Sequence, residues 1–414
     1  MAVINRFPTG GGIPDDLTAD PSVVASGYKF VGGSTDEIET GTLQLSGNAK
    51  TSHVLKNNTF YDTDLKIKRT GTMEVANVIN LILSVSSGRV ITVKWTNPVS
   101  TSGRPYSGVY VRYQTGSYPT PTTGTQAYKG VGSSSASGAQ STITLTMPSL
   151  STTYYFIVYS YCTTSNGELL GNQLKGTIVT GSSQVVTITS SKNYTIPAGY
   201  TSMDIFGIGG GGAGATADWD SRTTGGGGGS GYTTTVKNIS ISAGQVLNCT
   251  IGSGGTSAGS STIYGGITKV VRNGTTLLEA MGSGGTYRNY YGGSGGSGGG
   301  RGGTSTGNGY AGGTNGGYGE GSGGGSGQMS TTRAFGESNG TLYGGGGGGG
   351  GGVEGSGGAG GAGGGANGGG GSSNGANASA NTGSGGGGGG RFNFGGNEGQ
   401  GGSGSAGIIL IRLK

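Results

Sequence analysis

"YGGGGGGGGGVEGSGGAGGAGGG", residues Tyr343 to Gly365, contains a run of nine glycines, Gly344 to Gly352, and decides how the last part of the chain can fold. Glycine loses more backbone freedom on folding than any other residue, and this stretch has almost no apolar surface to bury in return. Its composition alone is typical of a flexible linker. An ordered structure here must therefore be stabilised by backbone hydrogen bonds.

Side chains near this run recur at every third residue, in two series with glycine at nearly all positions between. The series are Val353, Ser356, Ala359, Ala362 and Phe394, Asn397, Gln400, Ser403, Ala406. A period of three is that of the polyproline II conformation, which makes no hydrogen bonds within its own segment. If such segments pack side by side, their backbones can form hydrogen bonds with one another only where no Cβ holds them apart. Two of every three positions must then be glycine, and the third position faces outward and can carry a side chain. The pattern predicts an ordered polyglycine II bundle over residues 282–407, with the nine-glycine run innermost; the alternative is a disordered linker.

Other glycine-rich architectures fit the sequence less well. Collagen needs abundant proline in a strict repeat, but the nine prolines of the chain end at Pro197. Calcium-binding β-helix repeats need an aspartate in each unit, and no aspartate follows Asp220. An RNA-binding segment of the RGG type would repeat its arginine, whereas only Arg301 lies in an RGG triplet.

The whole chain is unusual in composition. Glycine supplies 104 of 414 residues and only 10% are charged, with a net charge of +6 that is spread too thinly to indicate nucleic-acid binding. The start of the chain lacks the apolar segment of a secretory signal, and the longest aliphatic run, Ile408 to Ile411, is too short to span a membrane. We expect cytoplasmic synthesis, no membrane insertion, and no disulfide between Cys162 and Cys249, which fall in different predicted domains.

The amino-terminal part contains an internal repeat. After an arm over residues 1–16, shifting the sequence by 30 residues aligns Thr40–Leu43 with Thr70–Met73, so residues 17–78 are predicted to hold two copies of one small unit. The segment "VLKNNTFYDTDLKIKRTGTM", residues 54–73, resembles short repeats near the amino terminus of tail and baseplate-attached proteins of bacteriophages. The resemblance implies attachment of the protein to its particle.

Residues 79–181 read as consecutive short strands separated by turns. They are "LILSVSSG", "VITVKWTNP", "GVYVRYQTG", "STITLTMPSL", "TTYYFIVYSYC" and "LKGTIVTG", and the alternation in the fifth places Tyr155, Ile157, Tyr159 and Tyr161 on one face. A β-sandwich is predicted. The layout resembles a fibronectin type III domain, with Trp95 on the second strand and "LSTTYY" near the tyrosine corner of that family. The proline usual in that corner is missing, which leaves the choice of corner tyrosine open.

Residues 182–414 begin with strands, continue through the glycine-rich region and close with "GIILIRLK", which is predicted to be a strand of the same sandwich. Pairing of this last strand would fix both ends of the glycine-rich region. The segment resembles the glycine-rich carboxyl-terminal domains of phage tail fibre and receptor-binding proteins, some of which contain packed polyglycine II helices. A comparable arrangement occurs in the ectodomain of anaplastic lymphoma kinase. The fold class is therefore expected to be mainly β, with two sandwiches and an inserted polyglycine II bundle.

Catalytic chemistry finds little support. The only histidine is His53, so histidine-based triads and multi-histidine metal sites cannot form elsewhere. Gly207–Gly212 satisfies GxGxxG, but no helix pattern follows and we reject a dinucleotide site. Asp218 and Asp220 read more simply as part of an exposed loop than as a catalytic carboxylate pair. We expect neither an enzyme nor a bound cofactor or metal.

The sequence supports a binding function better than catalysis, because aromatic and arginine side chains interrupt the glycine-rich region where turns are expected. The candidate receptor-binding residues are Trp219, Arg222, Tyr287, Arg288, Tyr290, Tyr291, Arg333, Phe335, Arg391 and Phe392. Aromatic faces with guanidinium groups suit sugars, carboxylates and phosphates of cell surfaces. The alternative is that these side chains only cover the glycine segments.

The resemblances, together with these features, imply a non-enzymatic phage tail fibre or receptor-binding protein located in the virion tail. Its partners would be tail or baseplate proteins, through the amino terminus, and a host-surface glycan or protein, through the glycine-rich tip. The resemblance to fibre proteins implies a homo-oligomer such as a trimer. The alternative is a bacterial cell-surface adhesin or a structural glycine-rich surface protein, and an adhesin should carry an export signal or wall anchor. A depolymerase would need convergent carboxylates, which the tip offers sparsely.

Overall fold

The computed structural model describes residues 20–31, 38–64, 67–218, 223–256, 263–286, 290–391 and 398–414. The protein is mainly β, as predicted, and the helical elements in these residues are two short 3-10 turns, η1 (Thr51–His53) and η2 (Ala334–Gly336). The chain divides into two compact units. The first holds most residues up to 178, and the second holds residues 179–414 with the short segments 85–91 and 146–152.

The amino-terminal part repeats its backbone hydrogen bonds at an offset of 30 residues, the offset expected from the sequence. The N–H of Ser26 donates to Leu43 O at 2.9 Å, and the N–H of Lys56 donates to Met73 O at 3.0 Å. Each copy also contains a short antiparallel ladder. The ladders pair β1 (Lys29–Val31) with β2 (Ile38–Thr40), and β3 (Thr59–Phe60) with β4 (Arg69–Thr70).

The next eight strands form two antiparallel sheets. They are β5 (Ile79–Ser87), β6 (Val90–Thr96), β7 (Gly108–Thr115), β8 (Thr125–Gly130), β9 (Gln140–Thr146), β10 (Thr153–Thr164), β11 (Gly167–Leu170) and β12 (Leu174–Val179). One sheet has the order β5-β6-β9, and the other has the order β11-β10-β7-β8, with β12 also paired to β10. The six strands predicted here are all present, and β8 and β11 are additional.

Strand β10 is buried on both faces. Phe156 and Val158 are fully buried, as is Trp95, whose indole N–H donates to Asn97 Oδ1 at 2.9 Å. On the opposite face, the alternation places Ile157, Tyr159 and Tyr161 together as predicted, in a cluster with Tyr110. The Tyr110 and Tyr159 rings stack at 5.2 Å. Aromatic pairs of this kind strengthen a sheet beyond simple burial of area.

The glycine-rich unit is built on a second pair of four-stranded sheets. Their strands are β13 (Gln184–Ile188), β14 (Lys192–Thr195), β15 (Ser202–Ile208), β16 (Thr233–Ser240), β17 (Val246–Thr250), β18 (Thr268–Arg272), β19 (Thr275–Ala280) and β20 (Ile408–Leu413). The orders are β13-β20-β15-β16 and β14-β17-β18-β19. The last strand therefore lies between β13 and β15, which confirms that both ends of the glycine-rich region are held in one sandwich.

The core of this sandwich is aliphatic. Met203 and Ile205 on β15, Leu247 on β17, and Ile409 and Ile411 on β20 are fully buried in one cluster. A second cluster lies on the other face of the β15–β20 ladder and contains the aromatic residues Phe206 and Phe335. Burial of these side chains supplies the hydrophobic stabilisation that the glycine-rich segments lack.

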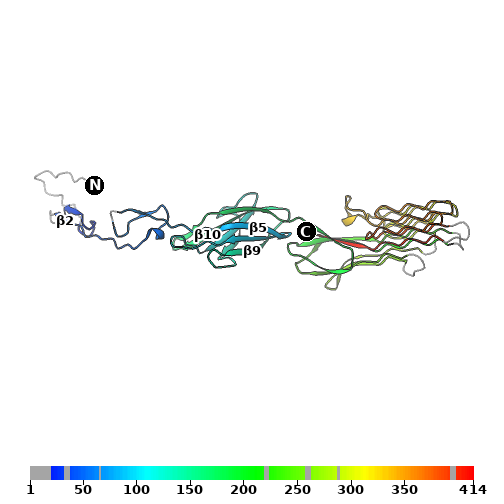
Figure 1. The fold of residues 1–414 in the computed structure, drawn as a ribbon, viewed down its shortest axis with the longest axis horizontal. Coiled ribbons are helices and arrows are strands. Elements are labelled where there is room, and N and C mark those ends of the chain that lie inside the picture. Colours follow the sequence, from blue (N-terminus) through cyan, green and yellow to red (C-terminus); the bar gives the residue numbers. More distant parts are fainter. Residues whose placement is uncertain are drawn as a thin grey trace. The chain divides into compact units, whose positions relative to one another are not determined.

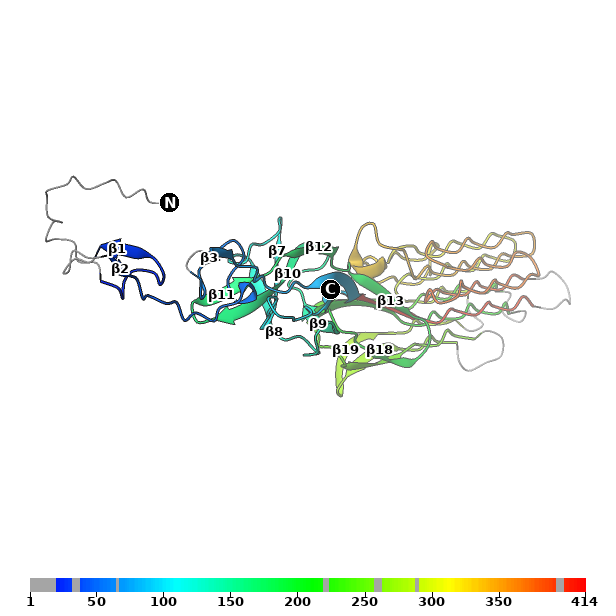
Figure 2. The same ribbon diagram turned by 60° about the vertical axis from the view of Figure 1, so that its left-hand side comes forward.

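Glycine-rich segments continue directly from the ends of the strands and run side by side beyond the sandwich (Figures 1 and 2). One begins after β15 at Gly209, and another ends at Gly407 before β20. The neighbouring backbones bond to each other, for example from the N–H of Gly211 to Ser405 O at 2.8 Å. The sandwich thus sets the starting positions of the glycine-rich segments.

The nine-glycine run is surrounded on all sides by other segments. From residue 346 to residue 352, its N–H groups donate to three neighbouring segments in rotation, so that each neighbour recurs every third residue; these neighbours are residues 307–313, 225–228 and 366–369. From residue 345 to residue 351, its carbonyl groups accept from three further segments, residues 358–361, 300–303 and 385–391. No glycine from 345 to 352 has a positive φ. Successive residues of the run thus bond to different neighbouring segments, and each neighbour is used again after three residues. This is the hydrogen-bond pattern of packed polyglycine II helices, as predicted.

Interior segments are those with unbroken glycine. Besides residues 344–352, the runs 225–229 and 385–390 are also buried and bond to neighbours on all sides. A Cβ built on Gly347 would lie 2.0 Å from Gly386 O, and one on Gly388 would lie 2.0 Å from Gly225 O. Real Cβ atoms do not approach so closely, so the spacing of the bundle excludes every other residue type at these positions.

Outer segments carry side chains at the third position. Ser356, Ala359 and Ala362 are exposed, as the spacing predicts, while the glycines between them lie against neighbours. Ser297 is an exception, because it is fully buried and its hydroxyl accepts the Gly316 N–H at 3.1 Å. The expected outward direction fails there, since a small hydroxyl can satisfy a backbone group inside the bundle.

Candidate functional site

Five of the ten sequence-predicted binding residues lie outside the described residues. They are Trp219, Arg222, Tyr287, Arg288 and Phe392. The other five, Tyr290, Tyr291, Arg333, Phe335 and Arg391, occupy three different environments.

Phe335 is a core residue. Its side chain is 3% exposed and packs against Phe206 at a ring-centroid distance of 6.2 Å, and the Arg412 guanidinium lies 4.0 Å from its ring centroid. Arg333 is held nearby by a bond from its Nη1 to Gly340 O at 2.8 Å. The expectation of an exposed anchor at Phe335 is therefore not met, because the loop turns this ring inward to cover the β15–β20 ladder.

Arg391 also belongs to the interior. It is 8% exposed, and its N–H donates to Gly351 O at 3.0 Å, which continues the bonding pattern of the nine-glycine run. A side chain at this depth can reach a ligand only if the covering segments move. Arg391 therefore does not contribute to a surface that is open in the structure.

Tyr290 and Tyr291 are brought together with two residues that the sequence analysis did not select as binding residues, Arg301 and Tyr310. The rings of Tyr290 and Tyr291 lie 4.2 Å apart, and the Tyr290 hydroxyl donates to the Tyr291 hydroxyl at 2.7 Å. The Arg301 guanidinium carbon is 5.1 Å from the Tyr290 ring centroid and 5.9 Å from that of Tyr310. We call these four residues the arginine–tyrosine cluster.

Glycine backbone supports the rings of this cluster. A Cβ on Gly323 would lie 2.4 Å from the Tyr291 ring, and one on Gly321 would lie 2.8 Å from the Tyr310 ring. Tyr291 and Tyr310 nonetheless remain 46% and 38% exposed. The cluster therefore presents aromatic surface to solvent on a backbone that is fixed by hydrogen bonds. The hydrogen bond with Tyr291 also raises the pKa of the Tyr290 phenol above its ordinary value.

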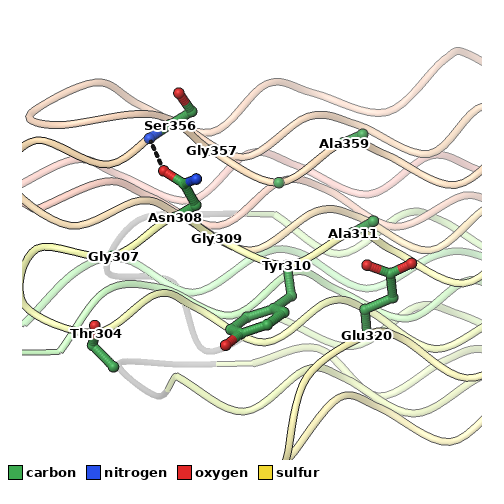
Figure 3. Close-up of a pocket in the computed structure, with 11 residues that line it drawn as sticks. Thr304, Gly307, Asn308, Gly309, Tyr310, Ala311, Glu320, Ser356, Gly357 and Ala359 are labelled. Carbon is green, nitrogen blue, oxygen red and sulfur yellow. Dashed lines mark hydrogen bonds between the residues drawn. The ribbon is translucent and has the colours of Figure 1, made fainter.

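Two hollows adjoin the cluster. One, of about 310 Å³, is lined by Thr223, Tyr290, Arg301, Gly303, Thr304 and Ser305. The other, of about 440 Å³, shares Thr304 with the first and extends along Tyr310 to Asn308, Glu320 and Ser356 (Figure 3). Their volumes are in the range of small-ligand sites.

Several polar groups in these hollows lack a protein partner. The Nε atom of Arg301 is buried and has none among the described residues. Asn308 accepts the Ser356 N–H at 2.9 Å through Oδ1, which directs its NH₂ group away from that bond. Within the same described ranges, the Glu320 carboxylate makes no hydrogen bond or ion pair. The Asn308 NH₂ group and the Glu320 carboxylate are therefore available as donor and acceptor around an exposed aromatic ring, and the Arg301 guanidinium lies beside it.

The sequence offered one signal for Arg301. Ser294 and Ser297 are three residues apart, and Arg301 does not continue this spacing; such a break in the period of three indicates a nearby turn. Tyr310 has no such signal, because its proximity to Arg301 depends on which glycine segments become neighbours.

The described residues contain neither a metal-binding cluster nor a membrane-spanning helix. Across the described ranges, no group of three or more His, Cys, Asp or Glu side chains could hold a metal ion. In those same ranges, no helix is long and apolar enough to cross a bilayer.

Comparison with known proteins gives one assignment. No curated protein matches the chain significantly. A glycine-rich domain family matches residues 186–414, which is more than half of the sequence and includes both the second sandwich and the glycine bundle. The chain therefore belongs to the glycine-rich domain family.

Proposed function

We propose that this protein is a receptor-binding protein of a bacteriophage tail, which attaches through its amino-terminal repeats and recognises the host surface through its glycine-rich domain. The order of the parts supports this function. Two small repeats precede a β-sandwich, and the glycine-rich domain comes last. Each repeat is too small to bury a core of its own, which favours docking to other tail or baseplate proteins.

The arginine–tyrosine cluster is the observation that carries the proposal. The glycine bundle is held by backbone bonds, so Tyr291 and Tyr310 are not needed as the apolar core of the domain. Exposed tyrosine and arginine side chains on a rigid support are characteristic of recognition surfaces, because little conformational freedom is lost when they bind. The host receptor is accordingly expected to contact this cluster, together with neighbouring loops.

The first sandwich acts in this proposal as a spacer of the fibronectin type III kind. The separation of its strands into a β5-β6-β9 sheet and a sheet containing β7, β8 and β10 supports that relationship. Its binding role would be limited to holding the glycine-rich domain at a distance from the particle. The protein would be a non-enzymatic component of the virion tail, made in the host cytoplasm and assembled as a homo-oligomer.

Two measurements test the proposal. Antibodies against the full-length protein should label the tails of phage particles in a lysate of the source, and fluorescent full-length protein should adsorb to susceptible cells. Labelling of the surface of uninfected producer cells would instead indicate a bacterial adhesin. A protein that neither joins particles nor adsorbs to cells would refute the proposed function.

A further inference from the structure

The two hollows beside the arginine–tyrosine cluster form one continuous polar surface. They share Thr304, and Arg301 of the smaller hollow lies against Tyr310 of the larger one. Glu320 lines the larger hollow beyond Tyr310 (Figure 3). A ligand longer than one ring could therefore contact Arg301 and Glu320 at the same time.

The chemistry along this surface changes from one hollow to the next. Arg301 supplies only donors and a positive charge, and its buried Nε has no partner among the described residues. Tyr310 supplies an exposed ring face, the NH₂ group of Asn308 donates, and the Glu320 carboxylate accepts. A ligand that satisfies all of these needs an acidic group, a flat face of C–H groups, and hydroxyl groups that donate and accept.

We propose that the two hollows bind a single acidic oligosaccharide. The carboxylate of a uronic acid residue pairs with Arg301, and the adjacent neutral sugar stacks on the Tyr310 ring. The hydroxyl groups of that sugar donate to Glu320 and accept from Asn308. This inference rests on the proposed function and deepens it by naming the class of receptor.

The Glu320 carboxylate restricts where the ligand can carry negative charge. Glu320 faces the larger hollow, so an acidic group on the neutral-sugar side would meet like charge in a partly desolvated site. A continuous polyanion such as a nucleic acid is disfavoured for the same reason. The preferred ligand therefore alternates acidic and neutral sugars.

The experiment uses calorimetric titration of the full-length protein with three probes. They are a tetrasaccharide of alternating glucuronic acid and N-acetylglucosamine, a neutral tetrasaccharide of N-acetylglucosamine, and free glucuronate. We expect the alternating tetrasaccharide to bind, the neutral one to bind more weakly, and free glucuronate to bind too weakly to measure. Equal affinity for the neutral and alternating tetrasaccharides would overturn the role of Arg301.

Three variants complete the test. Tyr310→Ala should lower the affinity on the order of 30-fold, the effect of removing an interface anchor. Arg301→Gln should abolish the preference for the acidic tetrasaccharide while retaining weak binding of the neutral one. Tyr318→Ala is the matched control, because Tyr318 is 57% exposed on the same bundle and lines neither hollow. Thermal melting of each variant shows whether the bundle is intact.

The outcomes separate this inference from the proposed function. If none of the three probes binds, or if Tyr310→Ala binds as tightly as Tyr318→Ala, the oligosaccharide site is refuted. If Tyr310→Ala and Arg301→Gln still adsorb to cells, the protein binds its receptor through another site, and the proposed receptor-binding function is retained. Oligosaccharide binding without adsorption to cells or attachment to particles would refute the proposed function and leave the site intact.

Discussion

Replacing Gly347 by alanine should strongly destabilise the glycine bundle. Its added Cβ would lie 2.0 Å from Gly386 O and 2.6 Å from the carbon of the same carbonyl, so the backbones must separate by about 1 Å to reach an acceptable contact. That separation strains the bonds that Gly347 makes, from its N–H to Gly228 O at 2.9 Å and from the Gly300 N–H to its own oxygen at 2.8 Å. Overpacking costs about 1–3 kcal/mol, and each weakened hydrogen bond about 1 kcal/mol.

The expected loss is therefore about 3–5 kcal/mol in the free energy of unfolding of the glycine-rich domain. Denaturant unfolding of the full-length variant measures it, and hydrogen exchange of residues 344–352 shows whether their amides lose protection. The control is Ala359→Ser, an equally small change at an exposed third position, which should alter stability by less than about 0.5 kcal/mol. Equal stability of the two variants would refute the close-packed bundle, and so would wild-type amides that exchange as fast as those of a free peptide.

Three further predictions concern other parts of the fold. Burial raises the pKa of the Cys249 thiol to about 11. A thiol reagent at neutral pH should therefore modify the partly exposed Cys162 in the native protein, and Cys249 only after unfolding. Modification of both cysteines in the native protein would contradict the buried position of Cys249. Burial of Asp204 would raise the pKa of its carboxyl group, but hydrogen bonds from Lys414 and from a backbone N–H outweigh burial and lower this pKa below 3.8. The Asp204–Lys414 pair therefore stabilises the fold above pH 3.8, and its contribution is lost as the pH falls through the lowered pKa of Asp204. Lys414→Met should then cost about 2 kcal/mol at pH 7, the typical contribution of a hydrogen bond to a charged group, and progressively less in acid; a pH-independent cost would show that the charge pair is not the cause. Phe335→Ala should lower the free energy of unfolding by about 3–4 kcal/mol but leave adsorption of the folded protein to cells unchanged. Loss of adsorption at a temperature where the variant is folded would show that Phe335 belongs to the binding site.

The main elements of the fold could be predicted from the sequence because their apolar residues alternate or their glycines follow a period of three. Strands β8 and β11 were missed for a physical reason. Both lie at the edge of their sheet, and "TQAYKG" and "GELL" have few fully buried side chains. An edge strand needs little apolar surface, so it leaves a weak sequence pattern.

The candidate site was less predictable. An aromatic residue that interrupts glycine can turn inward, as Phe335 does, or outward, as Tyr291 does, and the local sequence is similar in the two cases. Arg301 meets Tyr290 and Tyr310 because three outer segments pack as neighbours. Any glycine segment can bond to any other, so the choice of neighbours is set by turn lengths and by the sandwich, rather than by residue type.

The near absence of side chains inside the glycine bundle has a thermodynamic consequence. Exposure of apolar surface on unfolding raises the heat capacity, whereas exposure of polar surface lowers it. Interior segments such as residues 344–352 release mainly peptide groups to water, so their contribution to the heat-capacity change should be small for their length. A small heat-capacity change flattens the dependence of stability on temperature. The glycine bundle should therefore contribute much the same stability from near freezing to well above room temperature, a range over which a hydrophobic core such as that of the adjoining sandwich weakens on cooling.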